Sequence, residues 1–331
     1  MIKRILYLGY YFKELDWTIL KVFFDYVKKE KSKTQLWIDI IKSSLRYNIS
    51  ILDYFYFKFY KLTHKERSTY AGTGFMYEYQ LKMNPKEHRD ILENKILFLN
   101  EYKGFVIREF ASIGELENNP NKLKSILNNS SGKIVLKGSK GQVGKEVKIL
   151  KSDDIEPDRL MKFMKDNNFD LLEEYVVQHP VIMNLSPSGL NTIRIFTQII
   201  GNKIYYLGAR LRITINSEVD NMAAGNAAAP IDMETGIVNG SAVFSDITKV
   251  DIKIHPITNV PIIGLQIPFW DEIKEMVEKA ALNHPKNRSI GWDVAITEKG
   301  PELIEGNHNW CKILWQLPVK KGLKKEIEKF I

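Results

Sequence analysis

Cysteine is nearly absent from this chain of 331 residues, which contains Cys311 alone. A single cysteine excludes an internal disulfide framework and a cysteine-based zinc site, and it favours a reducing compartment. No uncharged apolar run approaches the roughly 20 residues that a membrane-spanning helix needs. The apolar residues near the start are followed by Lys13, Glu14 and Asp16 without a small-residue cleavage site. We therefore expect a cytoplasmic protein, with peripheral attachment to the inner face of the membrane left open.

Basic residues outnumber acidic ones, 48 to 40, which gives a net charge of +8. A basic chain favours polyanionic ligands such as nucleotides, acidic glycans, phospholipid surfaces or nucleic acid, and the charge alone does not choose among them. The hydrophobic and charged fractions, 44% and 27%, are those of an ordinary globular protein. No internal repeat or low-complexity tract is present.

The first 90 residues differ in composition from the rest. They contain one proline, Pro85, and they are rich in Tyr, Phe, Lys and Leu. We expect helices over about residues 17–29, 36–47 and 51–62. The aromatic run at 53–60 suits either a docking face or a helix buried in a core, and we favour the buried helix because aromatic side chains dominate ordinary cores.

Beyond residue 90 the pattern changes to strands joined as hairpins, with a few helices between them. This arrangement predicts an α+β fold with antiparallel sheets. We expect three parts: a helical N-terminal region at 1–90, a small subdomain with a glycine-rich flap at 91–176, and a C-terminal subdomain at 177–331.

Three oxygen-bearing side chains near the end of the chain form a candidate metal site. Glu305 and Asn307 are two apart, so on a strand they point to the same face. Asp293 lies on the preceding expected strand, and a turn at 298–301 joins the two strands. Hard oxygen ligands suit Mg²⁺, which shares its coordination shell with water and substrate phosphates. The alternative is a hairpin with an ordinary polar face.

A glycine-rich loop joins two further expected strands. Lys137 ends the first strand, and glycines at 138, 141 and 144 allow backbone N–H groups to approach an anion. Lys145 is followed by Glu146, so the loop is not a Walker A motif. The loop is either a flap over a nucleotide or a mobile surface hairpin.

The segment Glu173-Glu174-Tyr175-Val176 ends another expected strand. Its backbone C=O and N–H groups are suited to an adenine edge, and its carboxylates to ribose hydroxyls or the amino group. A solvated strand end is the commoner explanation for such a segment taken alone.

The order of these motifs resembles the ATP-grasp superfamily. In closer detail the chain is similar to the sugar-transfer-associated ATP-grasp family over about residues 45–315. This similarity lies in Asn191 to Arg194, in Ala209-Arg210-Leu211-Arg212, in Asp220-Asn221 with Gly225, and in Trp292-Asp293 with Glu305-Gly306-Asn307.

The resemblance implies an ATP-grasp fold that clamps ATP between two antiparallel sheets. It assigns the magnesium ligands to Asp293, Glu305 and Asn307. It assigns nucleotide binding to Lys95, Lys137, Ser139, Gly141, Gly144, Glu173, Glu174, Tyr175, Val176 and His179.

Two positions depart from the pattern of many ATP-grasp ligases, which carry an arginine where this chain has Gly291 or Asn309. We therefore expect the catalytic or substrate-binding positive charge to come from Arg194, Arg210 and Arg212. For each of them, a solvated outer strand face is the simpler alternative. The loop after Asp220 also departs, because Gly225 is followed by Asn226 rather than by a second glycine.

These assignments imply an ATP- and Mg²⁺-dependent carboxylate–amine ligase that acts through an acyl phosphate. The resemblance implies that an amino acid or small amine is joined to a sugar or cell-surface polysaccharide intermediate, with no nucleic acid partner. Within enzymes, an ATP-grasp kinase or a peptide ligase is the alternative. Outside them, it is a non-catalytic basic module that binds glycan or nucleic acid.

Overall fold

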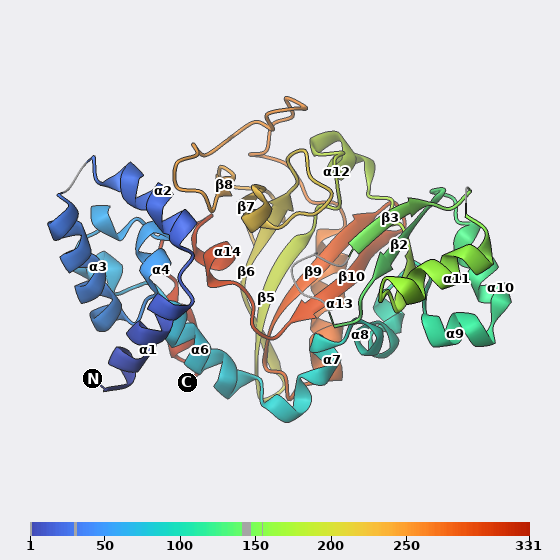
Figure 1. Ribbon diagram of the computed structural model, residues 1–331, viewed down its shortest axis with the longest axis horizontal. Coiled ribbons are helices and arrows are strands. Elements are labelled where there is room, and N and C mark those ends of the chain that lie inside the picture. Colours follow the sequence, from blue (N-terminus) through green and yellow to red (C-terminus); the bar gives the residue numbers. More distant parts are fainter. Residues whose placement is uncertain (1, 30–31, 141–146, 154) are drawn as a thin grey trace.

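The computed structural model describes residues 2–29, 32–140, 147–153 and 155–331. Figure 1 shows three parts side by side, with the helical N-terminal region in blue at the left, a large twisted sheet in the centre and a small green subdomain at the right. All strand pairs in the two sheets are antiparallel. The predicted α+β class with antiparallel sheets is therefore confirmed.

The N-terminal region is helical, as expected. Asp16, Ser32 and Ser50 cap the N-termini of three of its helices by accepting hydrogen bonds from backbone N–H groups. The helix expected over 51–62 ends earlier, and Lys58 at φ +52° begins a 3₁₀ turn in its place. The elements are α1 (Ile2–Lys13), α2 (Trp17–Val27), α3 (Lys33–Tyr47), α4 (Ile51–Tyr56), η1 (Phe59–Lys61), α5 (His64–Arg67) and α6 (Thr73–Met83).

The aromatic run of this region is buried. Tyr54, Phe55 and Phe59 are fully shielded from solvent and pack in one core with Leu36 and Ile40 of α3. The interpretation of the run as core rather than as a docking face is confirmed.

The small subdomain is a four-stranded sheet in the order β1-β4-β2-β3. Its core joins Leu116, Leu160 and Met164 of the helices to Leu136 and Leu172 of the sheet. The strands are β1 (Phe110–Ser112), β2 (Lys133–Lys137), β3 (Val147–Lys151) and β4 (Leu171–Glu174), and the helices are α9 (Ile113–Asn118), α10 (Pro120–Leu127) and α11 (Pro157–Asp166).

Short helices lead into this subdomain, namely η2 (Lys86–His88), α7 (Asp90–Glu93), α8 (Lys95–Glu101) and η3 (Lys103–Phe105). Phe98 and Leu99 of α8 belong to the core of the large sheet. Helix α8 thus holds the small subdomain against the C-terminal one.

The large sheet has six strands in the order β10-β9-β5-β6-β7-β8. Its strands are β5 (Ile193–Ile200), β6 (Lys203–Ile213), β7 (Ala227–Ile231), β8 (Val243–Phe244), β9 (Ser289–Thr297) and β10 (Gly300–Asn307). The accompanying helices are α12 (Pro180–Leu185), η4 (Met222–Ala224), α13 (Trp270–Asn283), α14 (Lys312–Gln316) and α15 (Lys324–Glu328).

The two faces of this sheet differ in character. Ile193, Ile195 and Val294 pack in the core that includes helix α13. Arg194 lies between the two isoleucines and therefore points to the opposite face. That second face carries the charged side chains of the candidate site.

The C-terminal segment packs against the N-terminal region. Ile313 belongs to the N-terminal core, and Lys312 Nζ lies 3.0 Å from the buried carboxylate of Asp53. Gln316 accepts a hydrogen bond from the backbone N–H of Ala71 and donates one to the carbonyl of the same residue.

Among the described residues, no helix is long and apolar enough to cross a bilayer. The predicted division at residues 90 and 176 stays a prediction.

Candidate active site

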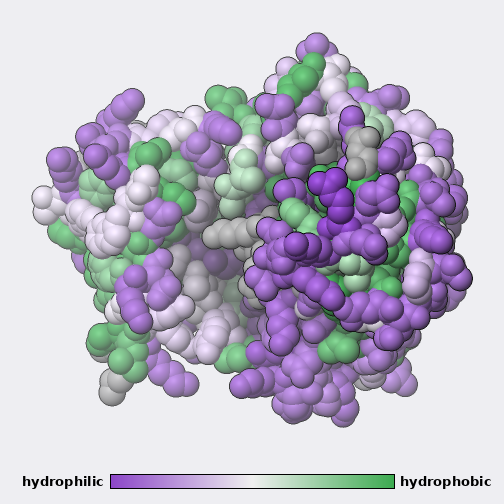
Figure 2. All heavy atoms as spheres, turned by 45° about the vertical axis from the view of Figure 1, so that its right-hand side comes forward, coloured by the Kyte–Doolittle hydropathy of each residue, from purple (hydrophilic) through white to green (hydrophobic). Residues whose placement is uncertain are grey.

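A cavity of about 830 Å³ lies where the three parts of the molecule meet. Figure 2 shows a hollow between the helical lobe on the left and the hydrophilic surface on the right. One side of the cavity is formed by β2, β3 and β4 of the small subdomain, and another by β5, β6, β9 and β10 of the large sheet. Helices α2 and α4 line its remaining end.

Charged side chains form a row across the large sheet. Glu305 of β10 lies opposite Asp293 of β9, and Asp293 lies opposite Arg194 of β5. Directly opposed residues of antiparallel strands project to the same face. The row therefore presents two carboxylates and a guanidinium to the cavity, as the spacing of Glu305 and Asn307 predicts for this hairpin.

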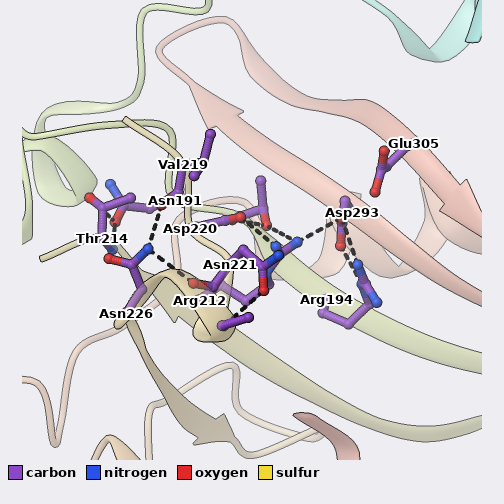
Figure 3. Close-up of polar contacts among 12 residues, drawn as sticks. Asn191, Arg194, Arg212, Thr214, Val219, Asp220, Asn221, Asn226, Asp293 and Glu305 are labelled. Carbon is purple, nitrogen blue, oxygen red and sulfur yellow. Dashed lines mark hydrogen bonds and ion pairs between the residues drawn. The ribbon is translucent and has the colours of Figure 1, made fainter. Parts of the chain in front are cut away.

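The carboxylate of Asp293 is held by two arginines (Figure 3). Arg194 donates to both of its oxygens, with Nη2 2.7 Å from Oδ2, and Arg212 Nη1 lies 2.7 Å from Oδ2. Burial raises the pKa of Asp293, but the charges of Arg194 and Arg212 outweigh burial and bring this pKa down to about 2. Asp293 is thus ionised at neutral pH, and it lines the cavity.

Arg212 connects this pair to a second carboxylate. Its Nη2 lies 2.5 Å from Oδ1 of Asp220, and the hydroxyl of Thr192 donates to the same aspartate. Burial raises the pKa of Asp220, an effect that Arg212 opposes and the charge of Asp293 reinforces. Arg194, Asp293, Arg212 and Asp220 therefore form one continuous network of alternating charge (Figure 3).

Asn226 shapes the loop that carries Asp220. Its amide nitrogen donates to the carbonyls of Val219 and Asn221, at 2.5 and 3.1 Å, and its oxygen accepts from the N–H of Ile215. Gly225 precedes it at φ +89°, a conformation that favours glycine. The asparagine that replaces the second glycine thus has a structural role in holding the loop.

Glu305 and Asn307 lie beside Asp293. Asn307 Nδ2 donates to Glu305 Oε1 at 3.0 Å, and both side chains line the cavity. Removal from solvent and the nearby charge of Asp293 raise the pKa of Glu305. In the described residues, no three or more His, Cys, Asp or Glu side chains are arranged to hold a metal ion.

Two of the three predicted ligands, Glu305 and Asn307, nevertheless suit a divalent cation. Glu305 is a carboxylate whose ionisation is opposed by its surroundings, and a cation beside it would remove that penalty. Asn307 adds a neutral oxygen of the type that Mg²⁺ accepts. Asp293 differs, because two arginines already bind its oxygens.

The predicted phosphate-binding lysines lie across the cavity on the small subdomain. Lys95 Nζ donates to the carbonyl of Gly138 at 3.1 Å, next to the glycine-rich loop. Lys137 Nζ lies 2.9 Å from both oxygens of Glu173. Both lysines line the cavity.

Glu173 is the centre of a buried ion-pair network. Arg108 Nε lies 2.6 Å from Glu173, and Arg108 Nη1 lies 2.8 Å from Glu302 of β10. Burial raises the pKa of Glu173, but Arg108 and Lys137 together lower it to about 2. The side chain of Glu173 therefore orders Lys137 and joins the two subdomains. Sequence reasoning missed Arg108, because its partners lie 65 and 194 positions away.

The three residues that follow Glu173 face the cavity as expected. Glu174, Tyr175 and Val176 line it, and Glu174 accepts a hydrogen bond from the N–H of Glu109 at 2.8 Å. These residues lie on the same side as Lys137, as a nucleotide site requires.

Three predicted residues are not among the described residues that line the cavity. Ser139 binds Asp170 through its backbone N–H and its hydroxyl. His179 caps helix α12 by accepting from the N–H of Val181. Arg210 donates to the backbone carbonyls of Ala209 and Trp315, and burial lowers its pKa to about 9. Gly141 and Gly144 lie outside the described residues.

The model of the family described as "Sugar-transfer associated ATP-grasp" matches residues 75–331. A search of curated proteins found no match. The match begins later than the resemblance seen in the sequence and continues to residue 331.

Among solved structures, the ATP-grasp ligase PsnB is 13% identical, with a TM-score of 0.42, over 80% of this chain and 68% of that chain. D-alanyl-alanine synthetase A from Vibrio cholerae is 13% identical, with a TM-score of 0.39, over 71% and 61%. An L-amino acid ligase from Bacillus licheniformis is 11% identical, with a TM-score of 0.39, over 71% and 48%. The chain therefore spans less than two thirds of the latter two. Because the family model covers most of its length, the chain belongs to the sugar-transfer associated ATP-grasp family.

Proposed function

We propose that this protein is an ATP- and Mg²⁺-dependent carboxylate–amine ligase. One observation supports the proposal above the others. Two lysines on one side of a single cavity face two carboxylates, an amide and two arginines on the other side. Such a site provides positive charge for phosphates, oxygen ligands for a cation and guanidinium groups for a second anion.

ATP would lie between the small sheet and the large sheet. The backbone of Glu174, Tyr175 and Val176 would contact the adenine, and Lys95 and Lys137 the phosphates. Glu173 holds Lys137 through two contacts of 2.9 Å, so its position is set before the nucleotide enters.

Glu305 and Asn307 would hold Mg²⁺, with Asp293 beside them as the third ligand. The ion would neutralise charge on the phosphates during phosphoryl transfer. For Asp293 to reach the ion, one of its bonds to Arg194 or Arg212 has to open. The freed guanidinium group would then bind an anionic substrate, for which arginine is suited by its two-point geometry.

The reaction has two steps. An oxygen of the substrate carboxylate attacks the γ-phosphorus of ATP, and the bond to the β-phosphate oxygen breaks, which gives an acyl phosphate and ADP. An amine then attacks the acyl carbon, the carbon–oxygen bond to phosphate breaks, and the amine loses a proton. The protein contributes positioning, charge neutralisation and exclusion of water.

The carboxylate or the amine would belong to a sugar or cell-surface polysaccharide intermediate, with an amino acid or small amine as the other partner. The proposal includes the three-part division at residues 90 and 176. It also includes a cytoplasmic location. A kinase or a peptide ligase would use the same nucleotide site with a different acceptor.

The test is ADP and phosphate release from ATP and Mg²⁺ with panels of sugar acids, amino acids and amines. A ligase releases phosphate only when a carboxylate and an amine are both present. A kinase releases ADP without phosphate, and a binding module releases neither. Glu305→Gln should abolish the activity, whereas Glu298→Gln, on the exposed turn between β9 and β10, should leave it unchanged.

A further inference from the structure

The end of the cavity beside the N-terminal helices has no role in the site described so far. Thr18, Ile19 and Val22 of α2 and Tyr56 of α4 line it, together with Ile313 of α14. All but Thr18 present mainly apolar surface. This wall is continuous with the network of Arg212 and Asp220, since all of these residues line one cavity.

Negative charge is found beside this apolar wall. Asp246 lines the cavity, and its Oδ1 is fixed by the N–H and the hydroxyl of Thr248, at 2.9 and 2.7 Å. Burial, followed by the charges of nearby groups that include Asp53 and Asp246, raises the pKa of Tyr56 to about 12. Asp53 is paired with Lys312, whereas Asp246 forms no ion pair among the described residues.

The nearby cation, Lys249, forms no ion pair with Asp246 among the described residues. Lys249 also lines the cavity, but its Nζ lies 4.8 Å from the ring centroid of Phe244 and 3.5 Å from the carbonyl of Gly225. The side chain of Asp246 therefore has a fixed orientation, next to an apolar surface and within the same cavity as the arginine network.

We propose that this end of the cavity binds the amine substrate, and that this amine carries an apolar group. The proposal rests on the ligase function proposed above. Its ammonium group would face Asp246, and its apolar group would pack on Ile19, Val22 and Tyr56. The proposed nucleotide residues lie on the strands of the small subdomain, so the amine would reach the acyl carbon from the side of the N-terminal helices. The helical region thereby becomes the part of the chain that selects the amine.

The reactivity of Cys311 reports on binding at this end of the cavity. Cys311 is the single cysteine of the chain, is exposed and lines the cavity. The alkylation rate of Cys311 by N-ethylmaleimide is measured on the full chain. Three probes separate the two parts of the proposal: 2-phenylethylamine carries both groups, ethanolamine only the ammonium, and 2-phenylethanol only the ring. We expect 2-phenylethylamine to slow alkylation at roughly tenfold lower concentration than either of the others.

Val22→Asn places an uncharged polar group in the apolar wall without disturbing the core, because Val22 is 49% exposed. This variant should lose the protection by 2-phenylethylamine. Val250→Asn is the matched control, since Val250 is 82% exposed and does not line the cavity. It should keep full protection.

Equal protection by all three probes, or protection that survives Val22→Asn, would overturn the proposal. Absence of protection by 2-phenylethylamine would overturn it as well. ADP release is measured in parallel on the same protein. Protection without ADP release would contradict the ligase function and leave the binding site standing, whereas ADP release without protection would contradict only the amine site.

Discussion

Arg194 and Asp293 lie directly opposite each other on β5 and β9 and are joined by two hydrogen bonds. Arg194 is only 6% exposed, so the pair is almost completely removed from bulk water. A buried pair of this kind adds little net stability, because desolvation offsets most of the attraction. Its placement beside Glu305 instead points to a role in presenting charge to the cavity.

Arg194→Lys should therefore impair catalysis more than folding. A lysine keeps the charge but cannot bind an anionic substrate at two points, and the loss of such a charge-assisted pair typically costs about 1.5–3 kcal/mol. We expect turnover to fall roughly 10- to 100-fold, with little change in ATP affinity measured by equilibrium binding. Arg159→Lys, at an exposed position of α11, is the control. Unaltered steady-state kinetics in the Arg194 variant would remove this arginine from the mechanism.

Glu305→Gln should stabilise the metal-free protein while it abolishes turnover. The pKa of Glu305 is raised in the folded state, so its ionisation opposes folding. The free energy of unfolding of the wild type should therefore fall as the pH rises through the ordinary glutamate value of about 4.3 towards the raised value. The glutamine variant lacks this loss.

At neutral pH the Tm of the Glu305→Gln variant should be higher by about 2–4 °C for each kcal/mol recovered. Thermal unfolding with EDTA measures this difference. Addition of Mg²⁺ should raise the Tm of the wild type more than that of the variant. A variant that is less stable than the wild type in EDTA would contradict the assigned environment of Glu305.

Glu173→Gln should weaken the joint between the subdomains. The pKa of Glu173 is about 2, well below its ordinary value, so its ionised form stabilises the fold. That contribution is fully present above about pH 4.3 and is lost as the pH falls through about 2; it amounts to roughly 3 kcal/mol. Urea unfolding at pH 7 and pH 3 should show a large loss at the higher pH and a smaller one at the lower pH. Glu117→Gln, which removes an exposed ion pair with Lys165, should change neither value appreciably.

Lys137→Met tests the nucleotide side of the cavity. The substitution removes a positive charge that faces the proposed phosphates, while Arg108 continues to neutralise Glu173. We expect the Kd for ATP to rise by roughly 10-fold or more. Fluorescence titration with a labelled ATP analogue measures it. Lys151→Met, at an exposed end of β3, should bind nucleotide like the wild type, and an equal loss in both variants would argue against the assignment.

The hairpin of β9 and β10 could be predicted from the sequence because its information is local. Glu305 and Asn307 follow the two-residue period of a strand, and Asp293 lies on the strand next to them. The structure adds a register shift between Leu303 and Glu305, which the pattern does not reveal. The helices of the N-terminal region, and the burial of its aromatic residues, could be predicted from the sequence for the same reason.

The contacts of the arginines could not be predicted from the sequence. Arg210 and Arg212 are two residues apart on β6, so the sequence pattern gives the same expectation for both. Arg212 reaches Asp220 and Asp293, whereas Arg210 binds the carbonyl of Trp315, which α14 brings near. The partners of Arg108 and the wall formed by α2 likewise depend on contacts between distant parts of the chain, which no local pattern specifies.

The contacts of residues 312–316 with the N-terminal region have a consequence for biosynthesis. Lys312 pairs with Asp53, and Gln316 binds Ala71 across 245 positions of sequence. The N-terminal helices leave the ribosome well before the segment that holds them against the large sheet. A nascent chain halted before residue 312 therefore contains the side chains of both sheets that line the cavity, but lacks the contacts that place α2 and α4 at its end. The order of translation thus delays a complete cavity until residues 312–316 have been made.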